Sequence, residues 1–424
     1  MAASDRPKAR GCWSSNCRST IGANGLRFDS HTTRAGVVCH APKKSHHRSF
    51  HAGSVESYCA LTRPHVALRT EGHRCDNAQV AVLRDLISLA SEQWEPAVEL
   101  AIFGTADSGD IAETIERWVT QRCGPIADAL FYRPGVGVVV GLALERGTGI
   151  VVKVHRWNVS IDRLQAVHQV QSLLSDSDRC APRPLVAPEP LAGGIATVEE
   201  LRTGARADGR DPLVRRALAE GLHAFVKAAA PLVGMADVGP SILLRPHGAA
   251  LWSEPHDVRF DFDATAQGAE WIDALATTAR RRLTAQSSHT VIGHFDWRMQ
   301  NLGFMGTELV AIYDWDSLAE APEAVLVGCN AAQFTADWSG TELDPLPTIG
   351  EMRSFVEEYE LARGKAFTDE EREILDAANL FLCAYGARCQ HSDMVLHPEL
   401  VRAPIPPWFR LLLERGEGAL LDLR

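Results

Sequence analysis

A group of acidic and amide side chains in the C-terminal half has residue types and spacings that could do chemistry. His294, Asp296 and Asn301 lie together in the segment HFDWRMQN, and Asp314 follows Asn301 by thirteen residues. A carboxylate can accept or orient the proton of a nucleophilic hydroxyl, and carboxylate and amide oxygens suit the magnesium ions that bridge phosphates. The set therefore indicates phosphoryl transfer, with Asp296 as catalytic base and Asn301 and Asp314 as magnesium ligands.

The apolar segments around these residues predict how they meet. The run before His294 reads as a short strand, and GFM and LVAIY read as a hairpin that returns Asp314 to the loop. His294, two residues before Asp296, is suited to brace the loop by hydrogen bonds. An Asp in a turn or an Asn that caps a helix would explain any one of these residues, but not the whole spaced set.

These segments resemble the aminoglycoside phosphotransferase and choline kinase family, relatives of the protein kinases. The family's catalytic loop reads HxDxxxxN, which HFDWRMQN matches, and a later apolar strand ends in Asp, which AIYDWDS matches. Recognisable motifs cover roughly residues 125–330. The resemblance implies an α+β, two-lobed protein-kinase-like fold and an enzyme that moves the γ-phosphoryl group of ATP, with Mg²⁺, to a hydroxyl of a small molecule.

Lys153 in GIVVKVHRW is the second anchor, because a Lys inside an apolar strand needs a partner. The resemblance implies that it contacts the α- and β-phosphates of ATP. Upstream, Gly135 and Gly137 in RPGVG fall where the family has its phosphate-covering loop, although a plain hairpin turn explains them nearly as well. The segment has no GK[ST] ending, so it does not indicate a P-loop.

The next helix departs from the kinase pattern. In kinases the strand Lys pairs with a Glu on this helix, but IDRLQAVHQVQSLL contains no Glu. Gln165, His168, Gln169 or Asp162 are candidate partners, and a carboxylate from elsewhere in the chain is another. The departure leaves open an alternative function, a nucleotide-binding regulatory protein of the same fold that has lost efficient catalysis.

Three further site residues are assigned by position in the resemblance. Glu200 and Leu201 fall at the linker between the lobes, where the backbone would contact adenine. Arg298, two residues after Asp296, takes the place of a protein-kinase Lys and would neutralise the γ-phosphoryl group, unless it is a surface Arg.

The sequence predicts three regions. Residues 1–75 are rich in Ser, Arg, His and Gly without a sustained period, which indicates a disordered tail or one that is not translated at all. Residues 78–200 predict N-terminal helices followed by a β-rich nucleotide-binding lobe. Residues 201–424 are mostly helical, and we expect them to form the catalytic and substrate lobe.

Charge and composition limit the partners. The net charge is −11, and residues 76–424 hold 31 Lys and Arg against 50 Asp and Glu. So acidic a body argues against nucleic acid and is compatible with a cationic acceptor. The remaining rival is a metal- or nucleic-acid-binding module centred on the basic, His- and Cys-rich tail. No run of 18 apolar residues occurs, which predicts no membrane span, and the ten cysteines form no CxxC pair. We expect a cytoplasmic protein of unassigned oligomeric state.

The acceptor itself is not specified. The segment LWSEPHDVRFDFD, residues 251–263, is dense in acids and aromatics and could bind a cation, but an ordered loop with capping Asp residues is the simpler interpretation. Such folds read their acceptors through variable helical segments, so the resemblance does not name a substrate.

Overall fold

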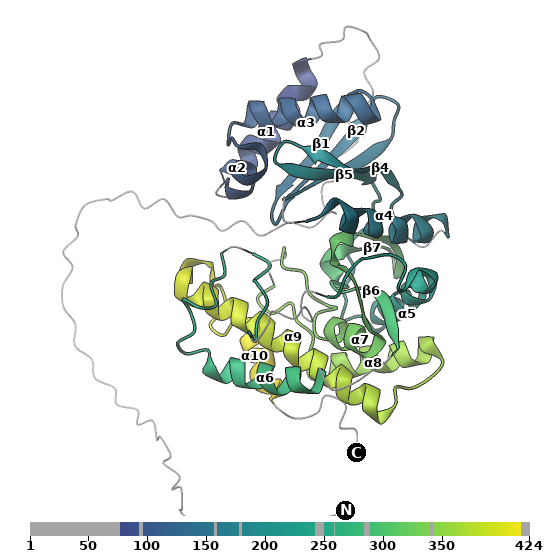
Figure 1. Cartoon of the computed structure of the whole chain (residues 1–424), viewed down its shortest axis with the longest axis vertical. Coiled ribbons are helices and arrows are strands. Elements are labelled where there is room, and N and C mark those ends of the chain that lie inside the picture. The colour runs from purple at the N-terminus through teal and green to yellow at the C-terminus, as the bar shows by residue number, and fades with distance from the viewer. Residues whose placement is uncertain are drawn as a thin grey trace, which may run out of the picture. The chain divides into compact units, whose positions relative to one another are not determined.

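The computed structural model describes residues 77–92, 96–156, 159–177, 180–241, 250–257, 259–283, 289–339 and 342–416 (Figure 1). All of them belong to one compact unit, His51–Arg424. The predicted tail, residues 1–75, lies outside the described residues.

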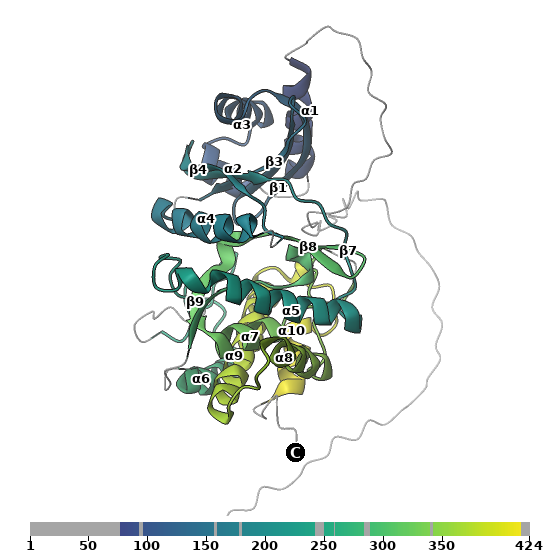
Figure 2. The same cartoon turned by 90° about the vertical axis from the view of Figure 1, so that its right-hand side faces the viewer.

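The first part, which we call the sheet lobe, contains helices and one antiparallel sheet. Its helices are α1 (Asn77–Ser91), α2 (Ala97–Phe103), α3 (Ser108–Cys123) and α4 (Ile161–Asp176). The strands are β1 (Ile126–Pro134), β2 (Val138–Leu144), β3 (Gly149–His155), β4 (Pro184–Leu191) and β5 (Gly194–Glu200), in the order β1-β2-β3-β5-β4. Figures 1 and 2 show α1 and α3 on one side of this sheet and α4 on the other.

Alternation along β3 and β5 gives this sheet one apolar and one polar face. Val152 and Val154 pack with α1, α2 and α3 in a core of their own. Their neighbours Lys153 and His155 point to the opposite face, as period-two geometry requires. Lys153 pairs with Thr197 of β5, and Glu199 lies two residues along the same face. These polar side chains are buried, so each needs a partner.

The second part, which we call the helical lobe, carries the remaining elements. Its helices are α5 (Pro212–Ala229), α6 (Glu270–Leu283), α7 (Glu323–Ala331), α8 (Ile349–Arg363), α9 (Asp369–Leu396) and α10 (Pro407–Arg415). Two small antiparallel pairs join β6 (Thr290–His294) to β9 (Leu318–Pro322) and β7 (Leu302–Met305) to β8 (Glu308–Ile312). Short 3₁₀ turns are η1 (Ala230–Leu232), η3 (Met299–Asn301), η4 (Trp315–Ser317) and η5 (Pro398–Leu400). The architecture is α+β, as the sequence predicts.

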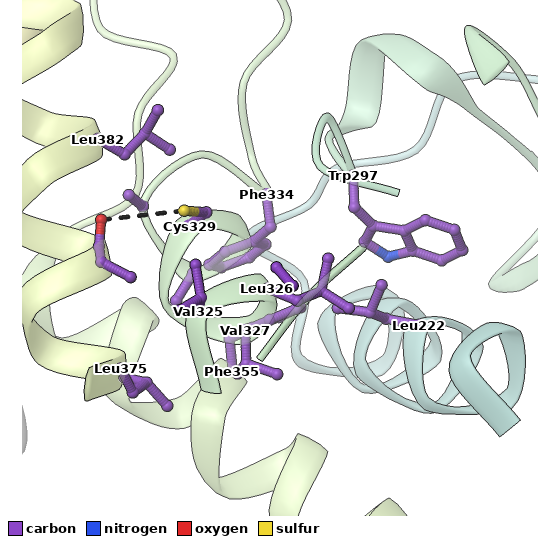
Figure 3. Close-up of a cluster of buried hydrophobic side chains, with 14 of the residues drawn as sticks. Leu222, Trp297, Val325, Leu326, Val327, Cys329, Phe334, Phe355, Leu375 and Leu382 are labelled. Atoms are coloured by element: carbon purple, nitrogen blue, oxygen red, sulfur yellow. Dashed lines mark hydrogen bonds between the residues drawn. The ribbon is translucent and has the colours of Figure 1, made fainter. Parts of the chain in front are cut away.

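Helix α7 forms the centre of the helical lobe, since every one of its residues is buried. Figure 3 shows its apolar side chains Val325, Leu326 and Val327 among Trp297, Phe334, Phe355 and Leu375. Gly328 lies so close to α9 that an added Cβ would overlap the Leu375 carbonyl group, which explains the glycine. The same core includes the apolar side chains of α4, so α4 packs with the helical lobe rather than with the core of the sheet lobe.

Candidate active site

The loop between β6 and β7 brings Asp296 and Asn301 together. The Asn301 side-chain nitrogen donates to Asp296 Oδ2 at 2.7 Å and to the Asp296 carbonyl oxygen at 3.0 Å. Both bonds use the amide N–H₂ group, so the amide oxygen is the atom that Asn301 could offer to a cation. The turn η3 between the two residues makes this contact possible because it folds the loop back on itself.

His294 joins this loop to the segment that carries Asp314. Its ring is fully buried, and its Nε2–H donates to the Tyr313 carbonyl oxygen at 2.8 Å. Its Nδ1 then accepts the Asp296 backbone N–H at 3.3 Å. Burial lowers the pKa of His294 to about 4, so the ring is neutral near pH 7 and keeps this donor–acceptor pattern. The bracing that the sequence predicts for His294 is present.

Asp314 reaches the site at the end of the β7–β8 hairpin. The Tyr313 N–H donates to the Asn301 carbonyl oxygen at 2.8 Å, which fixes the register next to the loop. Asp314 itself adopts a left-handed backbone (φ 58°), a conformation that Asp tolerates better than most residues. Burial raises its pKa to about 6, and the negative charges of Asp316 and Asp296 add to the shift while Lys153 and Arg298 oppose it. These charges therefore share one site.

Lys153 finds its carboxylate on the neighbouring strand rather than on α4. Its Nζ lies 3.4 Å from Glu199 Oε1, and both side chains are almost completely buried. The other Glu199 oxygen, Oε2, accepts a hydrogen bond of 2.7 Å from Gln171 of α4. Gln165 and Gln169, which the sequence offered as partners of Lys153, are exposed on α4. The carboxylate thus comes from elsewhere in the chain, which was the last of the alternatives.

His155, two residues after Lys153 on the same face of β3, contacts the Asp314 segment. Its Nδ1 lies 2.9 Å from Asp316 Oδ2, and its Nε2 lies 3.2 Å from the Thr197 hydroxyl. Arg163 of α4 adds bonds to the carbonyl oxygens of Asp316 and Leu318. Burial by itself would raise the pKa of Asp316. The charges of His155, Lys153 and Arg163 outweigh this effect and hold the pKa below its usual range. The sequence analysis missed His155, although its spacing from Lys153 was the available signal.

The predicted phosphate-covering loop is a tight turn between β1 and β2. The Gly135 N–H donates to the Gly137 carbonyl oxygen at 2.8 Å. A Cβ on Gly137 would lie 2.6 Å from the Val154 carbonyl oxygen, so close packing against β3 by itself requires a glycine there. The hairpin alternative is therefore sufficient for Gly137, and a contact with phosphate stays a prediction.

Glu200 and Leu201 lie at the end of β5, where the chain leaves the sheet. Their backbone N–H groups already donate to Arg183 and Gly149 carbonyl oxygens, each at 2.9 Å. A contact between this segment and adenine stays a prediction. Arg298 is not a free surface residue, because its guanidinium pairs with Asp296 Oδ2 at 2.9 Å.

Two side-chain amides, those of Asn330 and Gln333, bond backbone groups of the loop that carries Asp296. Asn330 at the end of α7 is fully buried, accepts from the Trp297 N–H at 3.1 Å and donates to the His294 carbonyl oxygen at 2.9 Å. Gln333 donates to the Phe295 carbonyl oxygen at 2.8 Å. Nothing in the sequence pattern pointed to these two residues, because their partners are backbone groups far along the chain.

The aromatic segment around residue 256 packs on α9. His256 Nδ1 lies 2.8 Å from the Tyr385 hydroxyl, and the Trp252 indole N–H donates to Asp273 at 2.9 Å. Burial lowers the pKa of His256, and the negative charge of Asp257 opposes the shift. The segment is an ordered loop, and a role in binding stays a prediction.

No helix in the described part of the chain is long and apolar enough to cross a membrane. Within the same residues, no group of three or more His, Cys, Asp or Glu side chains is arranged to hold a metal ion by itself.

Comparisons with known proteins find matches among solved structures alone. No protein-family model matches the chain, and no curated protein matches it. An amicoumacin kinase, solved with AMP-PNP and Ca²⁺, is 11% identical with a TM-score of 0.49, over 71% of this chain and 91% of that one.

Two further structures match at similar levels. A spectinomycin phosphotransferase, solved with ADP and spectinomycin, is 13% identical with a TM-score of 0.47, over 73% of this chain and 96% of that one. A microcompartment-associated aminopropanol kinase is 12% identical with a TM-score of 0.47, over 73% and 95%. All three are small-molecule kinases or phosphotransferases, the kind of protein that the sequence motifs resemble. At these identities and scores, the likeness assigns neither a family nor an activity to this chain.

Proposed function

We propose that this chain is an ATP- and magnesium-dependent phosphotransferase that moves the γ-phosphoryl group to a hydroxyl of a small molecule. One observation carries the proposal: Asn301 bonds the Asp296 carboxylate with its side chain, and its carbonyl oxygen accepts the N–H of Tyr313, the residue before Asp314. A proton-accepting carboxylate, oxygen donors for a cation and a buried cationic side chain are the parts that phosphoryl transfer requires.

Asp296 is the residue that takes or orients the proton of the acceptor hydroxyl. Its bond to Asn301 and its pairing with Arg298 fix the direction of the carboxylate. Arg298 pairs with Asp296 in this structure, and in the proposed reaction its cationic group balances charge on the transferred phosphoryl group. Lys153, held by Glu199, orients the α- and β-phosphates.

The donor set fits magnesium. Mg²⁺ in kinases is held by one or two protein oxygens together with phosphates and water, so the lack of a three-residue cluster among the described residues does not argue against it. Asp314 and the amide oxygen of Asn301 are hard oxygen donors, and the negative charges around Asp314 favour a cation there. When bound, Mg²⁺ supplies charge neutralisation at the phosphate oxygens.

The acceptor is a small molecule that is bound by the helical lobe. His256 and its neighbours are the candidates for contact with it, because the acidic and aromatic side chains of this segment suit a cation. The acidity of residues 76–424 favours cationic acceptors within this class. The alternative, a regulatory protein without efficient catalysis, was motivated by the missing helix Glu. Glu199 beside Lys153 removes that motive.

A screen of hydroxylated and amino-substituted small molecules, monitored by ADP release with and without Mg²⁺, tests the proposal. We expect one acceptor class to stimulate ADP release, and EDTA to abolish it. Asp296→Asn keeps the size of the side chain and is expected to lower the rate by about 10²- to 10⁴-fold. Asp128→Asn, on an exposed position of β1, serves as the matched control. An unchanged rate in Asp296→Asn would show that the mechanism is wrong.

A further inference from the structure

The carboxylate that holds Lys153 lies on a strand, where a helix would be expected to supply it. We propose that Glu199 of β5, oriented by Gln171 of α4, is the positioning residue that fixes Lys153 for the nucleotide phosphates. This inference rests on the proposed function, because it assigns Glu199 a role in the same phosphotransfer site.

Strand register brings the pair together. Lys153 is directly opposite Thr197 in the antiparallel β3–β5 pair, and Glu199 is two residues further along β5 on the same face. Diagonal neighbours of this kind are within reach of long side chains. The resulting distance of 3.4 Å between Lys153 Nζ and Glu199 Oε1 needs no contribution from a helix.

Because Lys153 and Glu199 are both buried, each charge needs the other as its partner. The side chains of Lys153 and Glu199 are 7% and 8% exposed, so removing either charge would leave the other in a site with little water. Gln171 completes the arrangement, because its amide satisfies Glu199 Oε2 without adding charge. A Glu at position 171 beside Glu199 would place two negative charges next to one Lys. A neutral amide at this position avoids that repulsion.

The arrangement has a consequence for regulation of the site. Both members of the ion pair belong to one sheet, whereas the apolar side of α4 belongs to the core of the helical lobe. A shift of α4 would break the Gln171–Glu199 hydrogen bond but leave Lys153 and Glu199 in register. The strand register alone therefore keeps Glu199 beside Lys153, and Gln171 of α4 refines the orientation of the carboxylate.

The test uses the full-length protein, with ATP binding and acceptor-dependent ADP release measured for each variant. Glu199→Gln is expected to lower kcat/KM for ATP roughly 10- to 100-fold, as loss of an outer partner of a site does. Gln171→Ala is expected to lower it roughly 2- to 10-fold, since one hydrogen bond is lost. KM for the acceptor is expected to stay constant in both. Glu92→Gln after α1 and Gln169→Ala on α4 are exposed controls for the two changes.

An exchange variant separates positioning from a purely structural role. Glu199→Gln combined with Gln171→Glu keeps the charge of the site and moves the carboxylate to the helix. Its kcat/KM for ATP is expected to exceed that of Glu199→Gln several-fold, a coupling typical of residues in contact. If Glu199→Gln does not fold, the exchange variant decides: a value within about tenfold of the wild type supports the inference, and a larger loss overturns it.

Measurements on the wild type distinguish a failure of the proposed function from a failure of the positioning role of Glu199. If the wild type neither binds Mg·ATP nor releases ADP with any acceptor, the proposed function fails and the role of Glu199 fails with it. If the wild type does both while Glu199→Gln keeps its kcat/KM for ATP, the proposed function stands and the positioning role of Glu199 is wrong.

Discussion

His155 of β3 and Asp316 of η4 form a hydrogen bond of 2.9 Å that links the sheet lobe to the segment containing Asp314. The same strand carries Lys153, and the same turn begins at Asp314. This one contact therefore couples the residue assigned to the phosphates with the residue assigned to the metal.

We expect His155→Gln and Asp316→Asn each to lower kcat/KM for ATP, because either change loosens the Asp314 segment against Lys153. The double variant should lose less free energy of ATP binding than the sum of the two single variants, with a coupling energy on the order of 0.5–3 kcal/mol. A double-mutant cycle on ATP binding measures this coupling. His289→Gln, at an exposed site, is the control. Strictly additive effects would mean that the two residues act independently.

Asn330 supports the catalytic loop through two backbone groups of that loop. Asn330→Ala leaves the Trp297 N–H and the His294 carbonyl oxygen buried without this partner, so we expect a loss of about 2 kcal/mol in the free energy of unfolding. Asn330→Asp keeps the acceptor for Trp297 but loses the donor to His294. Urea denaturation of both variants, with ADP release measured alongside, checks the prediction. Wild-type stability in Asn330→Ala would contradict it.

His256 is predicted to contact the acceptor. His256→Ala removes a side chain that bonds the Tyr385 hydroxyl within the aromatic segment. We expect KM for the acceptor to rise several-fold, by an amount similar to the loss of one or two hydrogen bonds, while KM for ATP stays constant. Tyr385→Phe tests whether the effect comes from the orientation of His256. A rise in KM for ATP alone would place His256 on the nucleotide side.

His168 of α4 gives a pH-dependent contribution to stability. Burial lowers its pKa from 6.5 to about 4, and the positive charges of His155 and Lys153 add to the shift while Asp316 opposes it. The unfolded chain therefore takes up this proton near pH 6.5, and the folded chain takes it up only near pH 4. Stability is full above pH 6.5 and falls as the pH drops toward 4.

His168→Gln should flatten this dependence. The wild type is expected to lose up to about 3 kcal/mol more than the variant between pH 7.5 and pH 4. Urea denaturation of both proteins over this range measures the difference, and buried His294 contributes equally to both. Parallel stability curves for the two proteins would show that His168 titrates normally in the folded state.

Local patterns were enough to predict the α+β fold class and the helices that precede the β-rich part. They also predicted the strand that carries Lys153 and the loop that Asp296 and Asn301 share, but not the direct hydrogen bond between these two side chains. The partners of Lys153 and of the catalytic loop could not be predicted. Glu199 and Asn330 reach their partners through strand register and helix packing, which link residues distant in sequence.

The strand position of Glu199 also bears on how inactive members are recognised among kinase-like proteins. A chain without a glutamate on the helix after the lysine strand is easily classed as a pseudoenzyme. Here the carboxylate beside Lys153 is present, and it follows Lys153 in the next strand of the sheet. A test for catalytic competence should therefore ask whether any carboxylate reaches the lysine, whichever element carries it.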